Sequence, residues 1–332
     1  MEFRYNPLLN WWVMFAASRE KRPLMPKDWC PFCPGSGKVP DNYDVYLYPN
    51  DFPIMKLEPP DVPDNLTKID SNDKSLQLKI ERLYRTHKSY GKCDVVLYSP
   101  DHNGKIYDLS KSHMRKLIDL WSNRFKELSV EDKIKYVYIF ENRGEVVGVT
   151  MSHPHGQIYG YGFIPKKLEL ELKSSEEYFA SNNSCIFCDM IETEMAIKKR
   201  VVYENESFFA FVPFFAEYPY QIFICSKRHI QTLLDFRDKE KEDMGEIIQT
   251  IVKMYDSIFD MLFPYMMAFH QAPVDEKEYD YFHFHIEFYP PLRNKQTQKF
   301  NASSETGAWV HGNPASPEDK AAEMREIIKN IK

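Results

Sequence analysis

The run Ser-His-Pro-His-Gly-Gln at residues 152–157 contains the side chains best suited to chemistry. His155 carries a nucleophilic imidazole. Gln157, two residues later, lies on the same face of an extended segment and carries a neutral amide that can donate hydrogen bonds. An imidazole beside an amide donor can move a nucleotidyl group through a phosphohistidine. Gly156 lets the backbone pass close to whatever the second imidazole touches. We expect His153 and His155 to face opposite sides of the segment, so that each ring serves a different function.

The bulk composition is that of an ordinary globular protein, and its length predicts two domains. The chain has 332 residues, 43% of them hydrophobic and 28% charged, with a net charge of −6. This charge argues mildly against binding to bulk nucleic acid, although a local phosphate pocket remains compatible with it. No apolar run reaches the length of a membrane span, and the N-terminus lacks a signal-peptide pattern. We therefore expect a cytoplasmic protein whose partners do not include nucleic acid or membranes.

Four of the six cysteines form two Cys-x-x-Cys pairs, and each pair opens the same series of elements. A strand, an amphipathic helix, a second strand and a His-x-His pattern follow in both halves. The equivalent histidines His102 and His229 are 127 residues apart, and His153 and His283 are 130 residues apart. The sequence therefore predicts an α+β fold made by tandem duplication, with antiparallel sheets and packed helices. We divide it at residues 1–168 and 169–332, inside a charged stretch that we expect to be partly helical.

Each half also supplies the same four metal-binding side chains in the same order. Two cysteines and two histidines suit the closed tetrahedral shell of structural zinc, which leaves no open position for catalysis. In this interpretation His153 belongs to the metal, and His155 is available for chemistry. The alternatives are that the cysteine pairs bind nothing or form redox disulfides. The predicted ligands of two zinc ions per chain are Cys30, Cys33, His102 and His153 in the first half, and Cys185, Cys188, His229 and His283 in the second.

The second half differs from the first where the chemistry is predicted. Its segment reads His283-Phe-His285-Ile-Glu287, so that a carboxylate replaces the glutamine. A carboxylate only accepts hydrogen bonds and would repel a phosphate. We therefore predict that only the first half is catalytic, with His155 and Gln157 as its catalytic residues.

Taken together, these motifs resemble the galactose-1-phosphate uridylyltransferase family, the His-x-His-x-Gln branch of the histidine-triad superfamily. The resemblance rests on residues 152–157, both cysteine pairs, Ser99–His102 and Phe140–Gly144. It implies a duplicated histidine-triad-like unit, a homodimer, and a ping-pong exchange between UDP-glucose and galactose 1-phosphate. His155 would attack the α-phosphorus of UDP-glucose, release glucose 1-phosphate and hold UMP until galactose 1-phosphate collects it.

The resemblance also implies residues that contact the two substrates. They are Arg19, Arg22, Asn50, Asp51, Asn142, Thr150, Lys299 and Glu305. Some relatives hold their second metal through a glutamate and three histidines, and here Glu171, His270 and His285 match three of these positions, with Glu287 at the fourth. We prefer the second cysteine–histidine set because it reproduces the first.

Several other functions remain open at this point. Relatives with the same motifs transfer AMP from ADP-glucose to phosphate or phosphorolyse dinucleoside polyphosphates. A catalytically silent, zinc-stabilised nucleotide-binding module is a rival from another class. A histidine-triad hydrolase is a further alternative, although its motif ends in histidine where this chain has Gln157.

Overall fold

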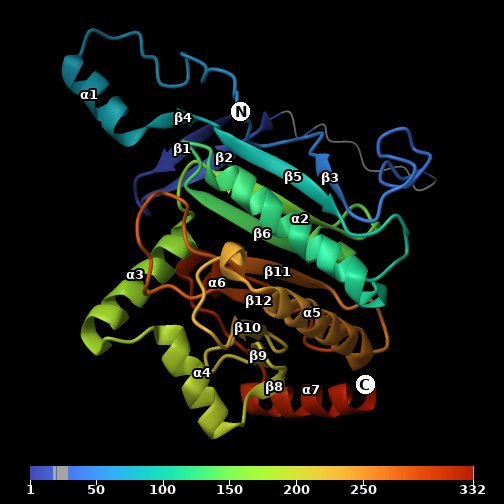
Figure 1. The fold of residues 1–332 in the computed structure, drawn as a ribbon. Helices are drawn as coiled ribbons and strands as arrows, with labels where there is room; N and C mark the ends of the chain where they lie inside the picture. Colours follow the sequence, from blue (N-terminus) through green and yellow to red (C-terminus); the bar gives the residue numbers. More distant parts are fainter. Residues whose placement is uncertain (18–19, 21–28, 332) are drawn as a thin grey trace.

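The computed structural model describes residues 1–17, 20 and 29–331, and one antiparallel sheet dominates this part of the chain (Figure 1). Its nine strands follow the order β3-β5-β7-β6-β11-β12-β10-β9-β8. The strands are β3 (Tyr46–Pro49), β5 (Gly91–Leu97), β6 (Tyr136–Arg143), β7 (His155–Tyr161), β8 (Val201–Glu204), β9 (Phe208–Phe211), β10 (Ile222–Ser226), β11 (Tyr265–His270) and β12 (His285–Tyr289). A smaller sheet pairs β1 (Glu2–Asn6) with β2 (Trp11–Phe15) and β4 (Thr86–Lys88).

The strand order shows the duplication directly. The neighbours β5, β7 and β6 of the first half correspond to β10, β12 and β11 of the second. The two halves meet where β6 pairs with β11, with Arg143 opposite Tyr265. The predicted α+β duplication is confirmed. We had expected a separate sheet in each half, whereas the structure joins both into one, because pairing β6 with β11 removes two exposed strand edges.

Two long helices cover one face of the sheet, as the apolar periodicity of the sequence predicts. They are α2 (Lys111–Ser129) and α5 (Asp238–Ile258), which lie side by side in Figure 1. Their apolar stripes are buried, and Trp121 of α2 and Tyr255 of α5 are both fully inaccessible. The C-terminal α7 (Pro317–Ile331) packs beside them through Met324. This helical layer supports one face of the sheet, including the strands that carry the histidines.

The opposite face is covered in each half by the segment that carries a cysteine pair. In the first half, Phe32 packs with Tyr48 and Leu97. In the second half, Phe187 at the start of α4 (Ile186–Ile197) packs with Phe223. The charged stretch between the halves is the helix α3 (Lys166–Asn182), as expected, and residue 168 lies in its first turn.

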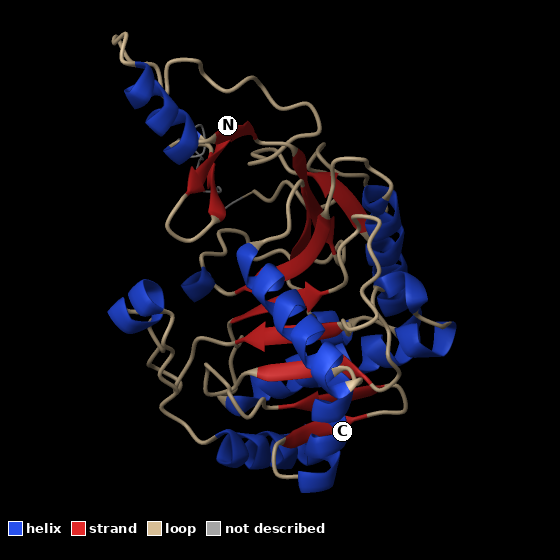
Figure 2. Ribbon diagram, turned by 90° about the vertical axis from the view of Figure 1, so that its left-hand side faces the viewer, coloured by secondary structure: helices blue, strands red, loops and turns tan. Residues whose placement is uncertain are grey.

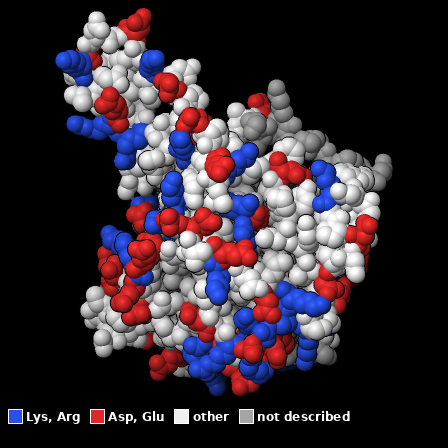
Figure 3. All heavy atoms as spheres, turned by 45° about the horizontal axis from the view of Figure 1, so that its top comes forward, with Lys and Arg blue, Asp and Glu red and all other residues white. Residues whose placement is uncertain are grey.

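The remaining helices lie at the periphery. The helix α1 (Lys74–Leu83) projects from the body beyond the small sheet, and none of its residues is buried (Figures 1 and 2). The short α6 (Ser303–Ala308) belongs to the C-terminal segment. The face shown in Figure 3 carries basic and acidic side chains interspersed. Among the described residues, no helix has the length and apolar character needed to cross a membrane.

Candidate active site and metal centres

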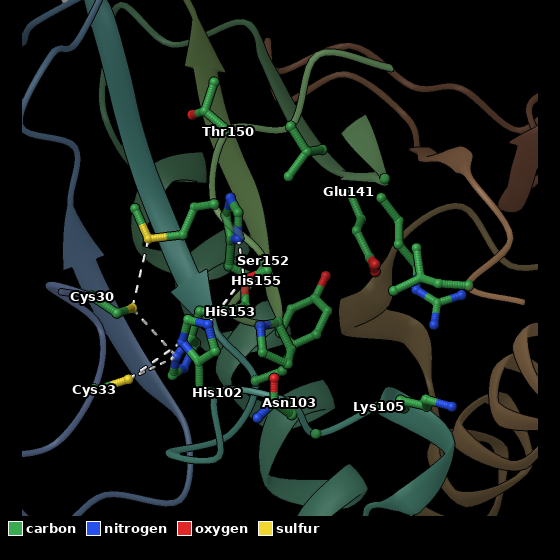
Figure 4. A pocket seen from close by; sticks show the side chains of 18 of the residues that line it. Cys30, Cys33, His102, Asn103, Lys105, Glu141, Thr150, Ser152, His153 and His155 are labelled. Carbon is green, nitrogen blue, oxygen red and sulfur yellow. Dashed lines mark hydrogen bonds between the residues drawn. The ribbon is translucent and has the colours of Figure 1, made fainter. Parts of the chain in front are cut away.

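The predicted nucleophile, His155, is the first residue of β7 and lies at the edge of a large cavity. On β7 it pairs with Leu97 of β5, and Gln157 pairs with Phe140 of β6. The cavity has a volume of about 1310 Å³ and is lined by His155, Asn142 and Thr150 together with the first cysteine–histidine set. Figure 4 shows His155, Thr150 and the first cysteine–histidine set around it. A cleft of this size accommodates a nucleotide sugar.

The imidazole of His155 is held in one tautomer by the backbone beside it. Its Nδ1 lies 2.8 Å from the carbonyl oxygen of His153. Because a carbonyl only accepts, Nδ1 must donate its hydrogen, and the ring lone pair is therefore on Nε2. This is the tautomer that a nucleophilic histidine requires.

The amide of Gln157 is oriented in a similar way. The Tyr159 hydroxyl donates to Oε1 of Gln157 at 3.1 Å. With its oxygen engaged by Tyr159, the amide presents its NH₂ group as a hydrogen-bond donor. A neutral donor two residues from His155, on the same face of β7, suits the non-bridging oxygens of a phosphoryl group.

Gly156 is required by a close approach on the other face of β7. A Cβ atom at this position would lie 2.2 Å from the Tyr98 hydroxyl oxygen and 3.1 Å from the Phe140 carbonyl oxygen. Tyr98 is buried, with 2% of its surface exposed. The sequence predicted a close approach to the group that His155 touches, whereas the close approach in the structure is made by this phenol on the other face.

Replacing Gly156 by alanine is expected to destabilise the protein. Tyr98 must shift to admit the methyl group, and overpacking of this kind costs about 1–3 kcal/mol. Urea unfolding checks the loss, and Tyr98→Phe in the same background provides the control, because removing the hydroxyl should restore most of the stability. An alanine variant as stable as the native protein would contradict this account.

The expectation that His153 and His155 face opposite sides of the segment was wrong. The Phe32 ring lies edge-on to both imidazoles, with centroids 5.9 Å from His153 and 5.6 Å from His155. Side chains two residues apart on an extended segment share a face, so both rings point to the side covered by Phe32. The two imidazoles differ instead in which nitrogen the backbone engages: Nε2 of His153 lies 2.7 Å from the Ser99 carbonyl oxygen.

The first cysteine–histidine set is gathered into one group. Its four ligand atoms lie within 4.8 Å of one another. Cys33 Sγ is 3.4 Å from His102 Nδ1 and 3.7 Å from His153 Nδ1, and Cys30 Sγ is 3.7 Å from the latter. Tetrahedral zinc, with bonds of about 2.3 Å to sulfur and 2.0 Å to nitrogen, places such atoms roughly 3.5 Å apart.

The second set reproduces this arrangement. Cys188 Sγ lies 3.5 Å from both His229 Nδ1 and His283 Nδ1, and Cys185 Sγ lies 3.8 Å from the latter. Here too, Nε2 of the His-x-His residue meets a backbone carbonyl, that of Ser226, at 2.7 Å. A carbonyl on the far nitrogen fixes the tautomer that offers Nδ1 to a metal. All six cysteines are free.

The protonation of His153 also fits a metal. Burial lowers the pKa of His153 to about 4, so the ring is neutral near pH 7 and its Nδ1 carries a lone pair. Two thiolates and two neutral imidazoles form the donor set of structural zinc. The residues present therefore fit the ion that the sequence predicts.

Comparison with known proteins identifies the family. Residues 1–165 match the galactose-1-phosphate uridyl transferase N-terminal domain, and residues 171–320 match the C-terminal domain of the same family. The galactose-1-phosphate uridylyltransferase of Thermotoga maritima is 40% identical, and the match covers all of both chains. The chain belongs to the galactose-1-phosphate uridyl transferase family. The namesake enzyme of Saccharomyces cerevisiae is 35% identical over 90% of this chain and 86% of its own length.

Solved structures support the assignment to the galactose-1-phosphate uridyl transferase family. A structure described as uridylyltransferase superposes with a TM-score of 0.87 and 28% identity over 100% of both chains. An ADP-glucose phosphorylase from Arabidopsis thaliana gives a TM-score of 0.73 and 25% identity over 98% of both chains. The family resemblance predicted from the sequence is confirmed.

Only some of the predicted substrate contacts of this uridyl transferase family meet at the cavity. Asn142 and Thr150 line it. Asn50 and Asp51 follow β3, where the Asp51 carboxylate accepts a hydrogen bond from Tyr48 at 2.8 Å, and neither is a cavity-lining residue. Arg19 and Arg22 lie outside the described residues.

Lys299 and Glu305 lie apart from the cavity and close to each other. Lys299 Nζ is 3.5 Å from Glu305 Oε1 and 5.0 Å from the centroid of the Tyr218 ring. Neither residue lines the cavity around His155. Within one chain the structure therefore does not bring the predicted hexose contacts to the nucleophile.

The third group of potential ligands, Glu171, His270, His285 and Glu287, is also assembled. The sequence treated this group and the second cysteine–histidine set as alternatives for one metal. The structure forms both, and they share no residue. Glu171 of α3 bridges the two rings, with His270 Nδ1 at 2.8 Å and His285 Nε2 at 2.9 Å from its carboxylate.

Sequence reasoning missed two kinds of residue. The phenylalanine inside each cysteine pair, Phe32 or Phe187, packs against the His-x-His rings of its own half. Glu141 and Tyr98 line the cavity without having been singled out. For Phe32 and Phe187 the signal was present, because an aromatic residue occupies the same position in both repeats.

Proposed function

We propose that this chain exchanges UMP between UDP-glucose and galactose 1-phosphate by a ping-pong mechanism, with a uridylyl intermediate on His155. The observation that carries the proposal is the fixed tautomer of His155 at the edge of the cavity. The curated relatives, which bear the name galactose-1-phosphate uridylyltransferase, support the choice of substrates.

The transfer needs two displacements at one phosphorus atom. The Nε2 lone pair of His155 attacks the α-phosphorus of UDP-glucose, and the bond to the bridging oxygen breaks as glucose 1-phosphate leaves. A phosphate oxygen of galactose 1-phosphate then attacks the same phosphorus, and the N–P bond breaks to release UDP-galactose. The Nδ1 hydrogen stays on the ring, where the His153 carbonyl stabilises the positive charge of the uridylyl-imidazole.

In this mechanism Gln157 stabilises the phosphoryl oxygens without transferring a proton. Replacing Gln157 by glutamate copies the second repeat and places a carboxylate where negative charge develops. We expect kcat to fall by about 10²–10³-fold, the size of effect seen when an oxyanion donor is lost, with the melting temperature unchanged. Single-turnover uptake of the uridylyl group checks this, and Gln157→Asn, which keeps an amide on a shorter chain, is the control. A glutamate variant that reacts as fast as the asparagine variant would contradict the electrostatic role.

We infer that the second repeat is not catalytic. His285, the counterpart of His155, also donates from Nδ1 to a backbone carbonyl, that of His283 at 2.9 Å. Its Nε2, however, faces the Glu171 carboxylate, and its surface is 0% exposed. Against the opposing effect of burial, this carboxylate raises the pKa of His285 to about 9, so the ring is protonated near pH 7. A protonated, buried imidazole has no lone pair to offer a substrate.

We further propose two zinc ions per chain, one in each cysteine–histidine set, with a structural function. The third group neutralises its charge without an ion. The Lys167 ammonium lies 2.9 Å from Glu287 Oε2, and the protonated His285 lies beside Glu171. Two cations therefore offset two carboxylates where a metal would otherwise be needed.

We also propose a homodimer in which the partner supplies the hexose contacts. Lys299 and Glu305 are displaced from the cavity of their own chain, and exposed apolar side chains flank them. Phe300 is 71% exposed, and Val310 is 62% exposed. Apolar side chains exposed in this way beside functional residues are typical of an interface. Mixing Lys299→Ala and His155→Asn homodimers tests this, because exchange of subunits should restore transfer in part.

The test of the reaction is covalent labelling. The protein is incubated with UDP-glucose labelled in the uridylyl group and, separately, with ADP-glucose labelled in the adenylyl group, and acid-labile protein label is measured. We expect label from UDP-glucose that galactose 1-phosphate discharges. Label from ADP-glucose alone would favour the adenylyl transfer suggested by the phosphorylase neighbour, and no label from either would favour a nucleotide-binding module.

A further inference from the structure

The cavity at His155 has a second wall that the proposed mechanism does not use. Glu141 of β6 lines this wall, although only 6% of its surface is exposed. In Figure 4 its carboxylate points into the cavity from the side opposite Cys30 and Cys33. The Tyr265 hydroxyl of β11 donates to Glu141 Oε1 at 2.9 Å. Burying a carboxyl group is costly unless it is paired or hydrogen-bonded, so the contacts of Glu141 at this cavity are informative.

The second contact of this carboxylate is Tyr98, the residue that follows β5. The Tyr98 hydroxyl interacts with the Glu141 carboxyl group. Burial, together with the charge of Glu141, raises the pKa of Tyr98 well above its ordinary value, so the phenol keeps its hydrogen and acts as a donor. The Glu141 carboxyl group is therefore close enough to accept the hydrogen of this hydroxyl.

Tyr98 in turn touches the backbone on both sides of His155. Its amide nitrogen donates to the Pro154 carbonyl oxygen at 3.1 Å. Its hydroxyl lies so close to Gly156 that a Cβ there would be 2.2 Å away. The nucleophile is therefore held between two points that both belong to Tyr98. The Tyr98 hydroxyl can keep this position only while its acceptor, the Glu141 carboxyl group, stays in place.

We propose that Glu141 is a positioning residue for His155, acting through the Tyr98 hydroxyl that it holds against the Gly156 backbone. The inference rests on the proposed function of His155. In-line attack on phosphorus tolerates little displacement of the nucleophile, and a misplacement of about 1 Å can cost on the order of 10²-fold in rate. Tyr265 donates to the same carboxylate and lines the same cavity, but it lies on β11, which pairs with β6 and not with β7, so it supplies a matched control.

The experiment compares four single variants in the full chain. Tyr98→Phe removes the hydroxyl, Glu141→Ala removes its acceptor, and each is expected to slow single-turnover uptake of the uridylyl group by about tenfold with little change in KM. Burial raises the pKa of Glu141 to about 7. Glu141→Gln keeps an acceptor oxygen in the shape of the neutral acid, and should therefore recover most of the rate. Tyr265→Phe should lose as much thermal stability as Tyr98→Phe while slowing uptake less than about threefold.

The outcomes separate positioning from general stability. If Tyr265→Phe slows uptake as much as Tyr98→Phe, or if both Tyr98→Phe and Glu141→Ala react at the native rate, the proposal is overturned. A readout independent of turnover is the long-range ¹⁵N–¹H spectrum of His155. We expect one set of Nδ1–H tautomer signals in the native protein and in Tyr265→Phe, and shifted or doubled signals in Tyr98→Phe. Should the native protein take no label, the proposed function fails, and this spectrum still decides the inference: unchanged signals in Tyr98→Phe would refute it.

Discussion

Replacing His155 by asparagine is expected to lower the rate of UMP exchange by at least about 10⁴-fold, the scale seen when a catalytic nucleophile is removed. Asparagine can still donate a hydrogen bond to the His153 carbonyl, but its amide nitrogen has no lone pair able to attack phosphorus. Because His155 is only partly buried at the edge of the cavity, the melting temperature and the metal content should stay near native values. Acid-labile label from uridylyl-labelled UDP-glucose should disappear.

The second repeat provides the matched control, His285→Asn. This histidine has the same Nδ1 contact with the carbonyl two residues before it, but its Nε2 faces Glu171. Removing it leaves the buried Glu287 and the mostly buried Glu171 with one cation fewer, which costs about 3–5 kcal/mol, while labelling of His155 should persist. The two variants therefore have opposite expected effects. His155→Asn loses the transfer reaction and keeps its stability, whereas His285→Asn loses stability and keeps the reaction. If a stable His285→Asn protein took up no label, the chemistry would depend on the second repeat, and the assignment to His155 alone would be wrong.

Local patterns in the sequence predicted much of this site because the relevant contacts are local or repeated. The helix stripes, the cysteine pairs and the His-x-His patterns recur in both halves, and each recurrence constrains the other. The tautomer of His155 is set by a residue two positions away, His153, so a short segment contains the information. The metal groups are long-range, but their ligands are chemically distinctive and keep the same order in both halves.

What the sequence did not reveal depends on contacts between distant strands. Glu141 and Tyr265 lie on two different strands, Tyr98 follows a third, and no local pattern links them. The union of both halves into one sheet follows from pairing β6 with β11, and periodicity within each strand does not specify that partner. The distance of Lys299 from the cavity is likewise a property of the assembled chain. The shared face of the His153 and His155 rings, in contrast, could have been predicted from the sequence. Along a strand, side chains two residues apart always lie on the same face.

The second large effect is expected from the loss of a single zinc ligand, Cys33→Ala. Cys33 Sγ faces both histidines of its group, so its removal should reduce bound zinc from two ions per chain to one. Structural zinc contributes on the order of 10 kcal/mol of binding free energy in small zinc domains. Without it, the loop that carries His153 loses its attachment, and the carbonyl that fixes the His155 tautomer moves with it. Transfer should fall by about 10²-fold or more, since the misplacement acts directly on the nucleophile.

Cys188→Ala is the control, because its thiol faces both histidines of the second group. It should also lose one zinc ion and lower the melting temperature. Transfer should nevertheless remain within about threefold of native, since no reacting group depends on the second repeat. Metal analysis after gel filtration, melting curves and single-turnover labelling on both variants separate the two sites. Three ions in the native protein would show that the Glu171 group also binds a metal, and full transfer by Cys33→Ala with one ion bound would show that His155 is positioned without the first zinc.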